Sequence, residues 1–80
     1  MRIISQDGRI DIPYENSSIE VSCKYGCIYA YSGGFPSGVR IGTYDEQGKA
    51  FSVMQQIRDA YTEGCTVIRL PKNEEVVIDD

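Results

Sequence analysis

The sequence predicts an α+β fold in which one helix packs on one face of an antiparallel sheet of about five strands. Short strand-like runs recur along residues 2–44, a stretch with helical periodicity follows at 45–63, and one more strand-like run comes after it. The order is therefore β-β-β-β-α-β, and the helix can cover the apolar face of the sheet. Eighty residues suffice for one domain, which we place at residues 1–71, followed by an acidic C-terminal tail at 72–80.

The first two strands are predicted to form a β-hairpin. Asp7-Gly8 lies between two isoleucine-rich runs, and Asp-Gly favours the two positive φ angles of a two-residue type I′ turn. This turn would place Ile3 opposite Ile12. Pro13 cannot donate a ladder hydrogen bond, so the second strand is expected to end there.

A second hairpin is predicted from two runs, 19–24 and 27–31, joined by a tight turn at Tyr25-Gly26. The turn pairs two couples of apolar side chains on one face: Cys23 with Ile28, and Val21 with Ala30. The opposite face then displays two phenols beside polar neighbours, namely Tyr29 and Tyr31 with Ser22 and Glu20.

Residues 33–38 contain three glycines and a proline, which predicts a flexible loop. The strand that follows, 39–44, directs alternate side chains to one side: Val39, Ile41 and Thr43. The helix comes next, with Asp45 as the expected N-cap and Gly64 as the residue that closes it. Its buried stripe is expected to hold Ala50, Val53, Met54, Ile57 and Tyr61. A strand at 65–70 then ends at Pro71, and residues 76–78 form either a short edge strand or a disordered end.

The charge and cysteine content limit the partners and the compartment. The net charge of −4 lies mostly in the tail, which contains four acidic residues and a single base, Lys72. The chain has no basic patch, so direct nucleic-acid binding is not expected. No apolar run reaches the ~18 residues of a membrane span. The three cysteines, an odd number, indicate free structural thiols in a reducing cytoplasm, since a fourth metal ligand is missing. They are Cys23, Cys27 and Cys65.

Catalysis is not expected from this composition. The chain has no histidine, which is the most frequent general acid or base. Its paired carboxylates are adjacent in sequence and would not converge on a substrate from two sides. We therefore predict a binding protein with no cofactor and no catalytic residue.

Aromatic residues are the strongest indication of a binding surface. The chain has six tyrosines, and tyrosine is enriched in interfaces because it buries a large area and keeps a hydroxyl for hydrogen bonding. The predicted partner-binding residues combine aromatic side chains of one hairpin with two acids of the tail: Tyr29, Tyr31, Phe35, Tyr44, Glu74 and Glu75. In the alternative reading, half of the tyrosines pack against the helix. A thin core also favours a homo-oligomer.

A nucleotide site is the alternative to a protein-binding surface. Glycines in a loop let the backbone approach a ligand, an aromatic ring can stack on a base, and arginines can meet phosphate. The residues of this alternative site are Gly33, Gly34, Phe35, Arg40 and Arg69. The competing interpretation of the glycines is a flexible hairpin loop.

The opening residues 1–8 and the run 10–15 resemble a family of small phage and prophage proteins of Gram-positive bacteria. The resemblance continues over about residues 1–63, through four short motifs: Ile28-Tyr29-Ala30, Gly42-Thr43-Tyr44, Lys49-Ala50 and Ala60-Tyr61. Gly48 departs from the family, which usually carries glutamate there, and no catalytic residue can be transferred.

The resemblance implies a phage-encoded accessory protein in the cytoplasm of the host cell. Such a protein is expected to be an anti-defence inhibitor of the anti-CRISPR type, which binds and blocks a bacterial host defence protein. Two alternatives remain at this stage. One is an oligomeric sponge that sequesters a nucleotide immune signal, and the other is a structural or assembly factor of the phage particle.

Overall fold

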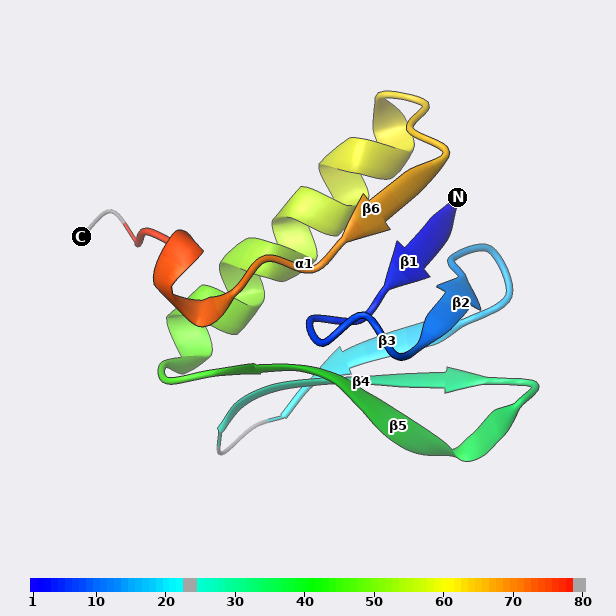
Figure 1. Cartoon of the computed structure of the whole chain (residues 1–80), viewed down its shortest axis with the longest axis horizontal. Helices are drawn as coiled ribbons and strands as arrows, with labels where there is room; N and C mark the ends of the chain where they lie inside the picture. The colour runs from blue at the N-terminus through cyan, green and yellow to red at the C-terminus, as the bar shows by residue number, and fades with distance from the viewer. Residues whose placement is uncertain (23–24, 79–80) are drawn as a thin grey trace.

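Two three-stranded sheets and one helix enclose a common core (Figure 1). The computed structural model describes residues 1–22 and 25–78. In chain order its elements are β1 (Arg2–Ile4), β2 (Asp11–Pro13), β3 (Ser18–Val21), β4 (Gly26–Ser32), β5 (Phe35–Tyr44), α1 (Gln47–Thr62), β6 (Val67–Arg69) and the 3-10 helix η1 (Asn73–Glu75). The α+β class is confirmed, whereas the single antiparallel sheet of about five strands is wrong.

The first sheet has the order β2-β1-β6 and joins the two ends of the chain. Ile3 pairs with Ile12 across the antiparallel β1–β2 ladder, as predicted, and with Ile68 across a parallel β1–β6 ladder. The parallel pair is possible because the second sheet and α1 lie between these strands in the sequence and bring β6 back in the direction of β1. A pairing over this distance leaves no local pattern, which is why the sequence did not predict a second sheet.

The β1–β2 connection is longer than the predicted two-residue turn. Only glycines among the described residues have a positive φ, so Asp7 does not adopt the type I′ conformation, although Gly8 does have a φ of 77°. The hydrogen bond from Ser5 N to Ile10 O, 2.8 Å, closes a four-residue loop. The Asp7 carboxylate holds that loop by accepting hydrogen bonds from the Ser5 hydroxyl and from the Arg9 backbone N–H.

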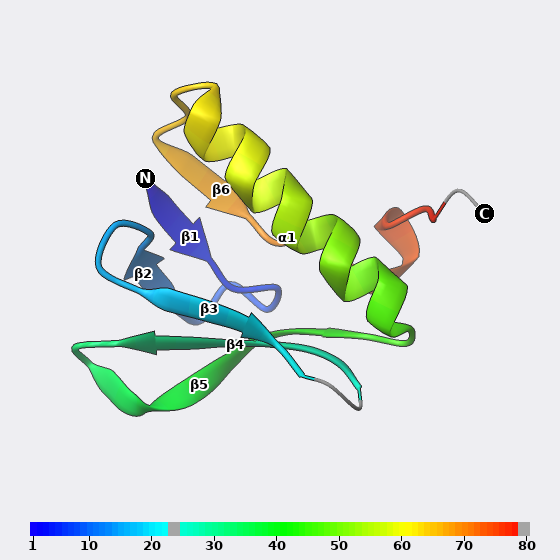
Figure 2. The ribbon, with the colours of Figure 1, turned by 180° about the vertical axis from the view of Figure 1, so that it is seen from behind.

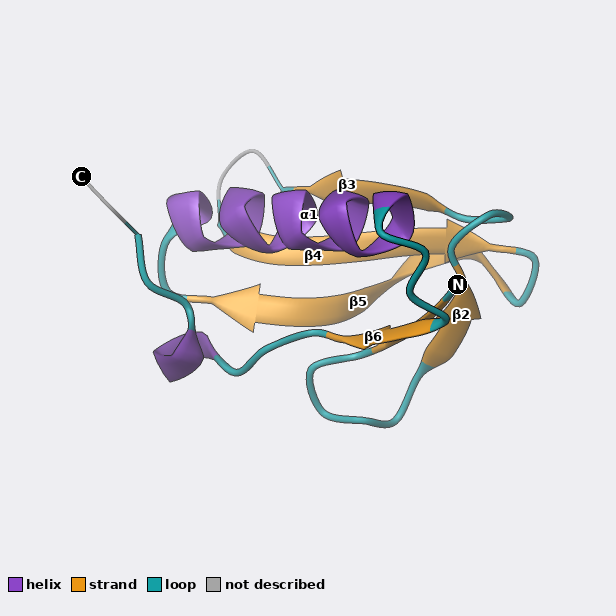
Figure 3. Cartoon of the chain, turned by 90° about the horizontal axis from the view of Figure 1, so that it is seen from above, coloured by secondary structure: helices purple, strands orange, loops and turns teal. Residues whose placement is uncertain are grey.

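The second sheet has the order β3-β4-β5, and its inner face packs on α1 (Figure 3). Val21 pairs with Ile28 and Ile19 with Ala30, so the predicted pairing of Val21 with Ala30 is wrong by two residues. A shift of two keeps every side chain on its predicted face. Ile28 and Ala30 are accordingly buried. The predicted partner of Ile28, Cys23, lies outside the described residues, as does the end of the predicted strand 19–24.

Most of the predicted loop 33–38 belongs to β5. Ser32 pairs with Phe35, so only Gly33 and Gly34 form the turn. The β4–β5 ladder has two irregularities, which allow a strand to contain glycine and proline. One of them lies beside Gly38, where φ is 90°. A prolonged strand was not predicted because glycine and proline in one run usually mark a loop.

The second irregularity changes which β5 side chains reach the core. Ile28 pairs with Gly42 and Tyr29 with Arg40, which leaves Ile41 as an additional residue in β5. A bulge of this kind reverses the alternation beyond it. Thr43 is therefore exposed, contrary to the prediction that it shares a side with Ile41, and Tyr44 is buried instead.

The helix ends as predicted and begins one residue late. Its N-cap is Glu46, because the predicted cap Asp45 is bound elsewhere: the Asn73 amide and the Lys49 ammonium contact its carboxylate and lower its pKa. At the other end Gly64 has a φ of 81°. The hydrogen bonds from Gly64 N to Tyr61 O and from Cys65 N to Ala60 O form a Schellman motif. Among the described residues, no helix is long and apolar enough to cross a bilayer.

The segment after Pro71 packs against the rest of the domain as far as it is described. Asn73 of η1 accepts a hydrogen bond from the backbone N–H of Asp45, and Val76 is part of the hydrophobic core. Residues 76–78 form no strand. The core that results is shared by both sheets, α1 and this segment: Ile3, Ile12, Ile28, Ala30, Ile41, Tyr44, Ala50, Val53, Ile57, Leu70 and Val76.

Candidate functional site

The outer face of the β3-β4-β5 sheet presents two phenols, as the sequence predicts. Tyr29 and Tyr31 alternate along β4 with side chains that pack beneath α1, so both point away from the helix. The ladder places Glu20 on one side of Tyr29 and Arg40 on the other. We call this surface the tyrosine face; it comprises Glu20, Tyr29, Tyr31 and Arg40.

Tyr31 is held in place by its neighbours on this face. Its hydroxyl lies 3.5 Å from Glu20 Oε1, at the limit of a hydrogen bond. Its ring lies on the backbone of Gly38, where a Cβ atom would come within 2.6 Å of Tyr31 Cε1. Glycine is therefore required at position 38 both for its φ and for this close approach. A ring with few accessible rotamers loses little entropy when a partner covers it.

Two of the predicted aromatic residues do not belong to the tyrosine face. Phe35 pairs with Ser32, one residue out of phase with Tyr31, and lies at the end of the β4–β5 hairpin with 37% of its surface exposed. Tyr44 is only 4% exposed, and its hydroxyl donates to Pro71 O at 2.7 Å. Burial, together with the charge of Glu75, raises the pKa of Tyr44 to about 12. Tyr44 is thus a core residue.

The predicted acidic residues lie far from the tyrosines. Glu74 and Glu75 belong to η1, which lies at the opposite end of the molecule from the β4–β5 turn (Figures 1 and 2). The carboxylate of Glu75 accepts a hydrogen bond from the backbone N–H of Lys72, 2.9 Å, and so closes the η1 turn. The structure does not join these acids and the phenols into one surface.

The residues of the alternative nucleotide site are also separated. Gly33 and Gly34 have no neighbouring atom within 4 Å of an added Cβ. Arg40 lies five residues after Phe35 in β5, roughly 17 Å at the rise of a strand, and it lines a small polar hollow of about 140 Å³ with Gln6 and Asp7. The Arg69 guanidinium lies over Gly8. No phosphate cradle is assembled from these residues.

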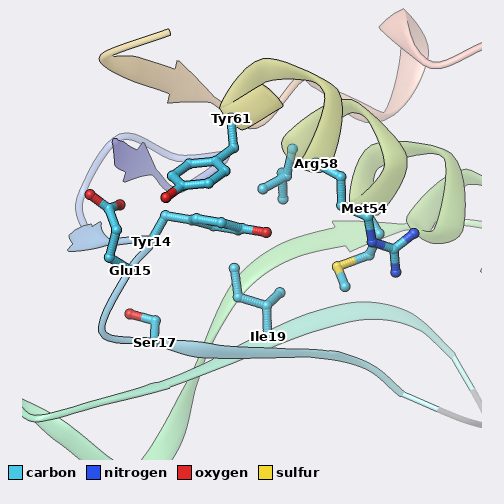
Figure 4. A pocket seen from close by; sticks show the side chains of 8 residues that line it. Tyr14, Glu15, Ser17, Ile19, Met54, Arg58 and Tyr61 are labelled. Carbon is cyan, nitrogen blue, oxygen red and sulfur yellow. The ribbon is translucent and has the colours of Figure 1, made fainter. Parts of the chain in front are cut away.

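A larger cavity lies elsewhere, between α1 and β3, and the sequence did not predict it (Figure 4). It is an open groove of about 490 Å³, which we call the α1–β3 groove. Its lining comes from the β2–β3 loop, from β3 and from α1 between Met54 and Tyr61: Tyr14, Glu15, Ser17, Ile19, Met54, Ile57, Arg58 and Tyr61. Met54 and Tyr61 were predicted to belong to the buried stripe of the helix. In the structure, both side chains line this groove instead.

An aromatic pair closes one end of the α1–β3 groove. The rings of Tyr14 and Tyr61 have centroids 4.7 Å apart and an angle of 38° between their planes. This tilted arrangement is favourable for aromatic rings. Tyr14 lies in a polar segment where nothing in the local pattern indicates a packing role, so the pair could not be predicted without the fold.

Of the two charged residues of the groove, Glu15 forms an ion pair with another described residue and Arg58 does not. The N-terminal ammonium of Met1 donates to both carboxylate oxygens of Glu15, at 2.7 and 2.8 Å, and lowers the pKa of Glu15. Arg58 donates to Gln55 Oε1 at 3.3 Å and forms no ion pair with any residue that the structure describes. The groove therefore presents one uncompensated positive charge.

Comparison with protein-family models, curated proteins and solved structures gave no match. The function must therefore be inferred from the residues themselves. Of the cysteines, Cys27 is buried and Cys65 is exposed, both as free thiols, and Cys23 lies outside the described residues.

Proposed function

We propose that this chain acts by binding another protein through the tyrosine face and blocks that protein by covering it. The observation that carries this proposal is the row Glu20–Tyr29–Arg40 across three strands, with the fixed Tyr31 ring beside it. Tyrosine and arginine are both enriched at the centre of protein interfaces and among their energetic hot spots. The sheet beneath keeps the four side chains in fixed relative positions.

A protein suits this surface better than a nucleic acid does. The tyrosine face carries one acid and one base, and the whole chain has a net charge of −4. Nucleic-acid binding usually depends on several cations that displace counterions from phosphates. The partner surface should therefore be close to neutral where it contacts the phenols.

The biological setting of the proposal comes from the resemblance of the opening residues to small phage proteins. In that setting the chain is an anti-defence inhibitor of the anti-CRISPR type, which acts stoichiometrically on a bacterial defence protein in the host cytoplasm. A small protein with a rigid binding face and no histidine is suited to blocking a partner by occupancy.

The proposal is tested by affinity capture from bacterial host lysate, with mass-spectrometric identification and titration of the captured protein. We expect Tyr29→Ser combined with Tyr31→Ser to weaken binding at least ~10-fold, since buried tyrosines are frequent hot spots. Tyr25→Ser is the matched control, because Tyr25 is exposed and outside the tyrosine face. Unchanged affinity of the double variant, with a native circular dichroism spectrum, contradicts the proposal.

The same experiment separates the alternatives. Capture of virion proteins would indicate a role in phage assembly. If Glu74→Gln with Glu75→Gln abolishes binding while the tyrosine variants do not, the acidic end of the molecule is the contact surface. Calorimetry with cyclic and ADP-ribose-type nucleotides tests the sponge, whose predicted residues Gly33, Gly34, Arg40 and Arg69 are not brought together.

A further inference from the structure

The outer edge of β3 is open to pairing. Ser22 N donates to Cys27 O at 2.9 Å, so Glu20 and Ser18, two and four residues before Ser22, also occupy hydrogen-bonded positions of the β3–β4 ladder. The residues between them, Ile19 and Val21, then direct their backbone N–H and C=O groups away from β4. Within residues 1–22 and 25–78, no strand pairs with this edge of β3. An edge of this kind is a template for an additional strand.

The α1–β3 groove runs beside this open edge. Figure 2 shows β3 at the front of its sheet with α1 above it, and Figure 4 shows Ile19 on the floor below Met54. An extended segment that pairs with β3 would therefore have alternate side chains beneath the helix. The volume of about 490 Å³ is in the range of ligand sites. Tyr14 and Tyr61 close the groove at one end.

The charges of the groove specify the chemistry of such a segment. The Glu15 carboxylate is compensated by the Met1 ammonium, whereas Arg58 has no carboxylate partner among the described residues. An acidic side chain on the incoming segment would supply that partner next to the apolar surface of Met54 and Ile19. A basic segment would place like charges together.

We propose that the α1–β3 groove binds an extended, acidic and apolar segment of a partner protein, which adds to the edge of β3 as a further strand. Backbone hydrogen bonds to Ile19 and Val21 hold the segment, its apolar side chains contact Ile19 and Met54, and an acidic side chain pairs with Arg58. This site is separate from the tyrosine face and does not depend on it.

The test uses three synthetic heptapeptides, each acetylated and amidated. The first has valine, glutamate and valine at the three alternate positions that face α1 and threonine at the other four, because side chains two residues apart share one face of a strand. The second replaces the glutamate by lysine, and the third is the acidic peptide with N-methyl groups on alternate backbone amides. Binding to the full chain is followed by the amide chemical shifts of Ile19 and Val21 in ¹⁵N-resolved NMR spectra. We expect the acidic peptide to bind with a Kd below about 1 mM and to shift both amides.

The control peptides each isolate one part of the proposal. The lysine peptide should bind at least ~10-fold more weakly because it repels Arg58. The N-methylated peptide should lose binding because it cannot form the ladder. Equal binding of the acidic and lysine peptides overturns the charge assignment, and equal binding of the N-methylated peptide overturns strand addition.

Two variants of the chain complete the test. Arg58→Glu should weaken the acidic peptide at least ~10-fold and strengthen the lysine peptide. Gln56→Glu adds the same sign of charge to α1 outside the groove and should change neither affinity. Tyr29→Ser with Tyr31→Ser should also leave peptide binding unchanged, so a failure of the tyrosine face is distinguishable. Shifts of the Ile19 and Val21 amides on dilution without peptide would overturn the proposal and assign this edge to a second copy of the chain.

Discussion

Gln6 connects the two sheets through a single side chain. Its Oε1 accepts a hydrogen bond from Thr43 N at 2.9 Å, and its Nε2 donates to Thr43 O at 3.1 Å and to Pro71 O at 3.3 Å. Its own backbone N–H donates to Ile41 O. The Gln6 amide thus forms hydrogen bonds with Thr43 that a neighbouring strand would otherwise form with β5. The bulge at Ile41, which interrupts the β4–β5 ladder, lies two residues before Thr43.

Loss of this amide should weaken the contact between the sheets. We expect Gln6→Ala to lower the free energy of unfolding by about 1–2 kcal/mol, since the backbone N–H and C=O of Thr43 lose their partner, whereas Pro71 O keeps the Tyr44 hydroxyl. Urea denaturation followed by circular dichroism measures the change. Gln56→Ala, on the exposed face of α1, is the control and should stay within about 0.5 kcal/mol. A similar effect of both variants would show that Gln6 has no special role.

Tyr44 should make stability depend on pH in the alkaline range. Its pKa is about 12 in the folded protein against an ordinary 10.0, so the buried phenol favours folding below pH 10. That contribution is lost as the pH rises from 10 through 12, because the unfolded state releases the phenol proton while the folded state still retains it. Unfolding measured between pH 9 and 12 should show a steeper loss for the native chain than for Tyr44→Phe. Parallel curves for the two proteins would contradict this.

At the scale of elements, the sequence predicts those pairings and helix ends that depend on residues close together in the chain. The Ile3–Ile12 pair and the closing Gly64 depend on turn and capping chemistry within a few residues. The bulge at Ile41 leaves no such local signal, and the backbone groups beside it bond to Gln6, which is remote in sequence. The start of α1 also depends on a remote residue, because the Asn73 side-chain amide donates a hydrogen bond to the carboxylate of Asp45, the predicted N-cap.

The N-cap of α1 can be improved by a substitution. Glu46 has extended φ and ψ angles, but its side chain makes no capping hydrogen bond. We expect Glu46→Ser to raise the free energy of unfolding by about 0.5–1 kcal/mol, because the serine hydroxyl can accept a bond from a free N–H of the first turn. Thermal and urea unfolding measure this gain. Glu46→Ala removes the same charge without a cap, and an equal gain in that variant would exclude the capping explanation.

At the scale of the whole molecule, the segment after Pro71 contributes to the core. Val76 is 5% exposed, whereas its neighbour Val77 is 78% exposed. Val76→Ala should therefore lower the free energy of unfolding by roughly 1–3 kcal/mol, and Val77→Ala should change it by less than about 0.5 kcal/mol. Urea denaturation of the two variants provides the comparison. Equal effects would show that this segment is detached from the domain in solution.

The candidate surfaces were predictable only in part. Strand alternation is a local property, so the shared face of Tyr29 and Tyr31 could be read from the sequence. Tyr44 was assigned to the surface because the bulge that turns it inward leaves no local signal. The α1–β3 groove needed the tertiary structure, since Tyr14 and Tyr61 meet only when the β2–β3 loop and the end of α1 are brought together.

The pairing of β1 with β6 has a consequence for biosynthesis. Arg2 pairs with Val67, so β1 leaves the ribosome well before its parallel neighbour β6 has been synthesised. At about 5–20 residues per second, that wait lasts several seconds. The β3-β4-β5 meander and α1 are made during that interval and can associate without the final strand. The nascent chain should therefore form the β3-β4-β5 meander and α1 before β1 pairs with β6.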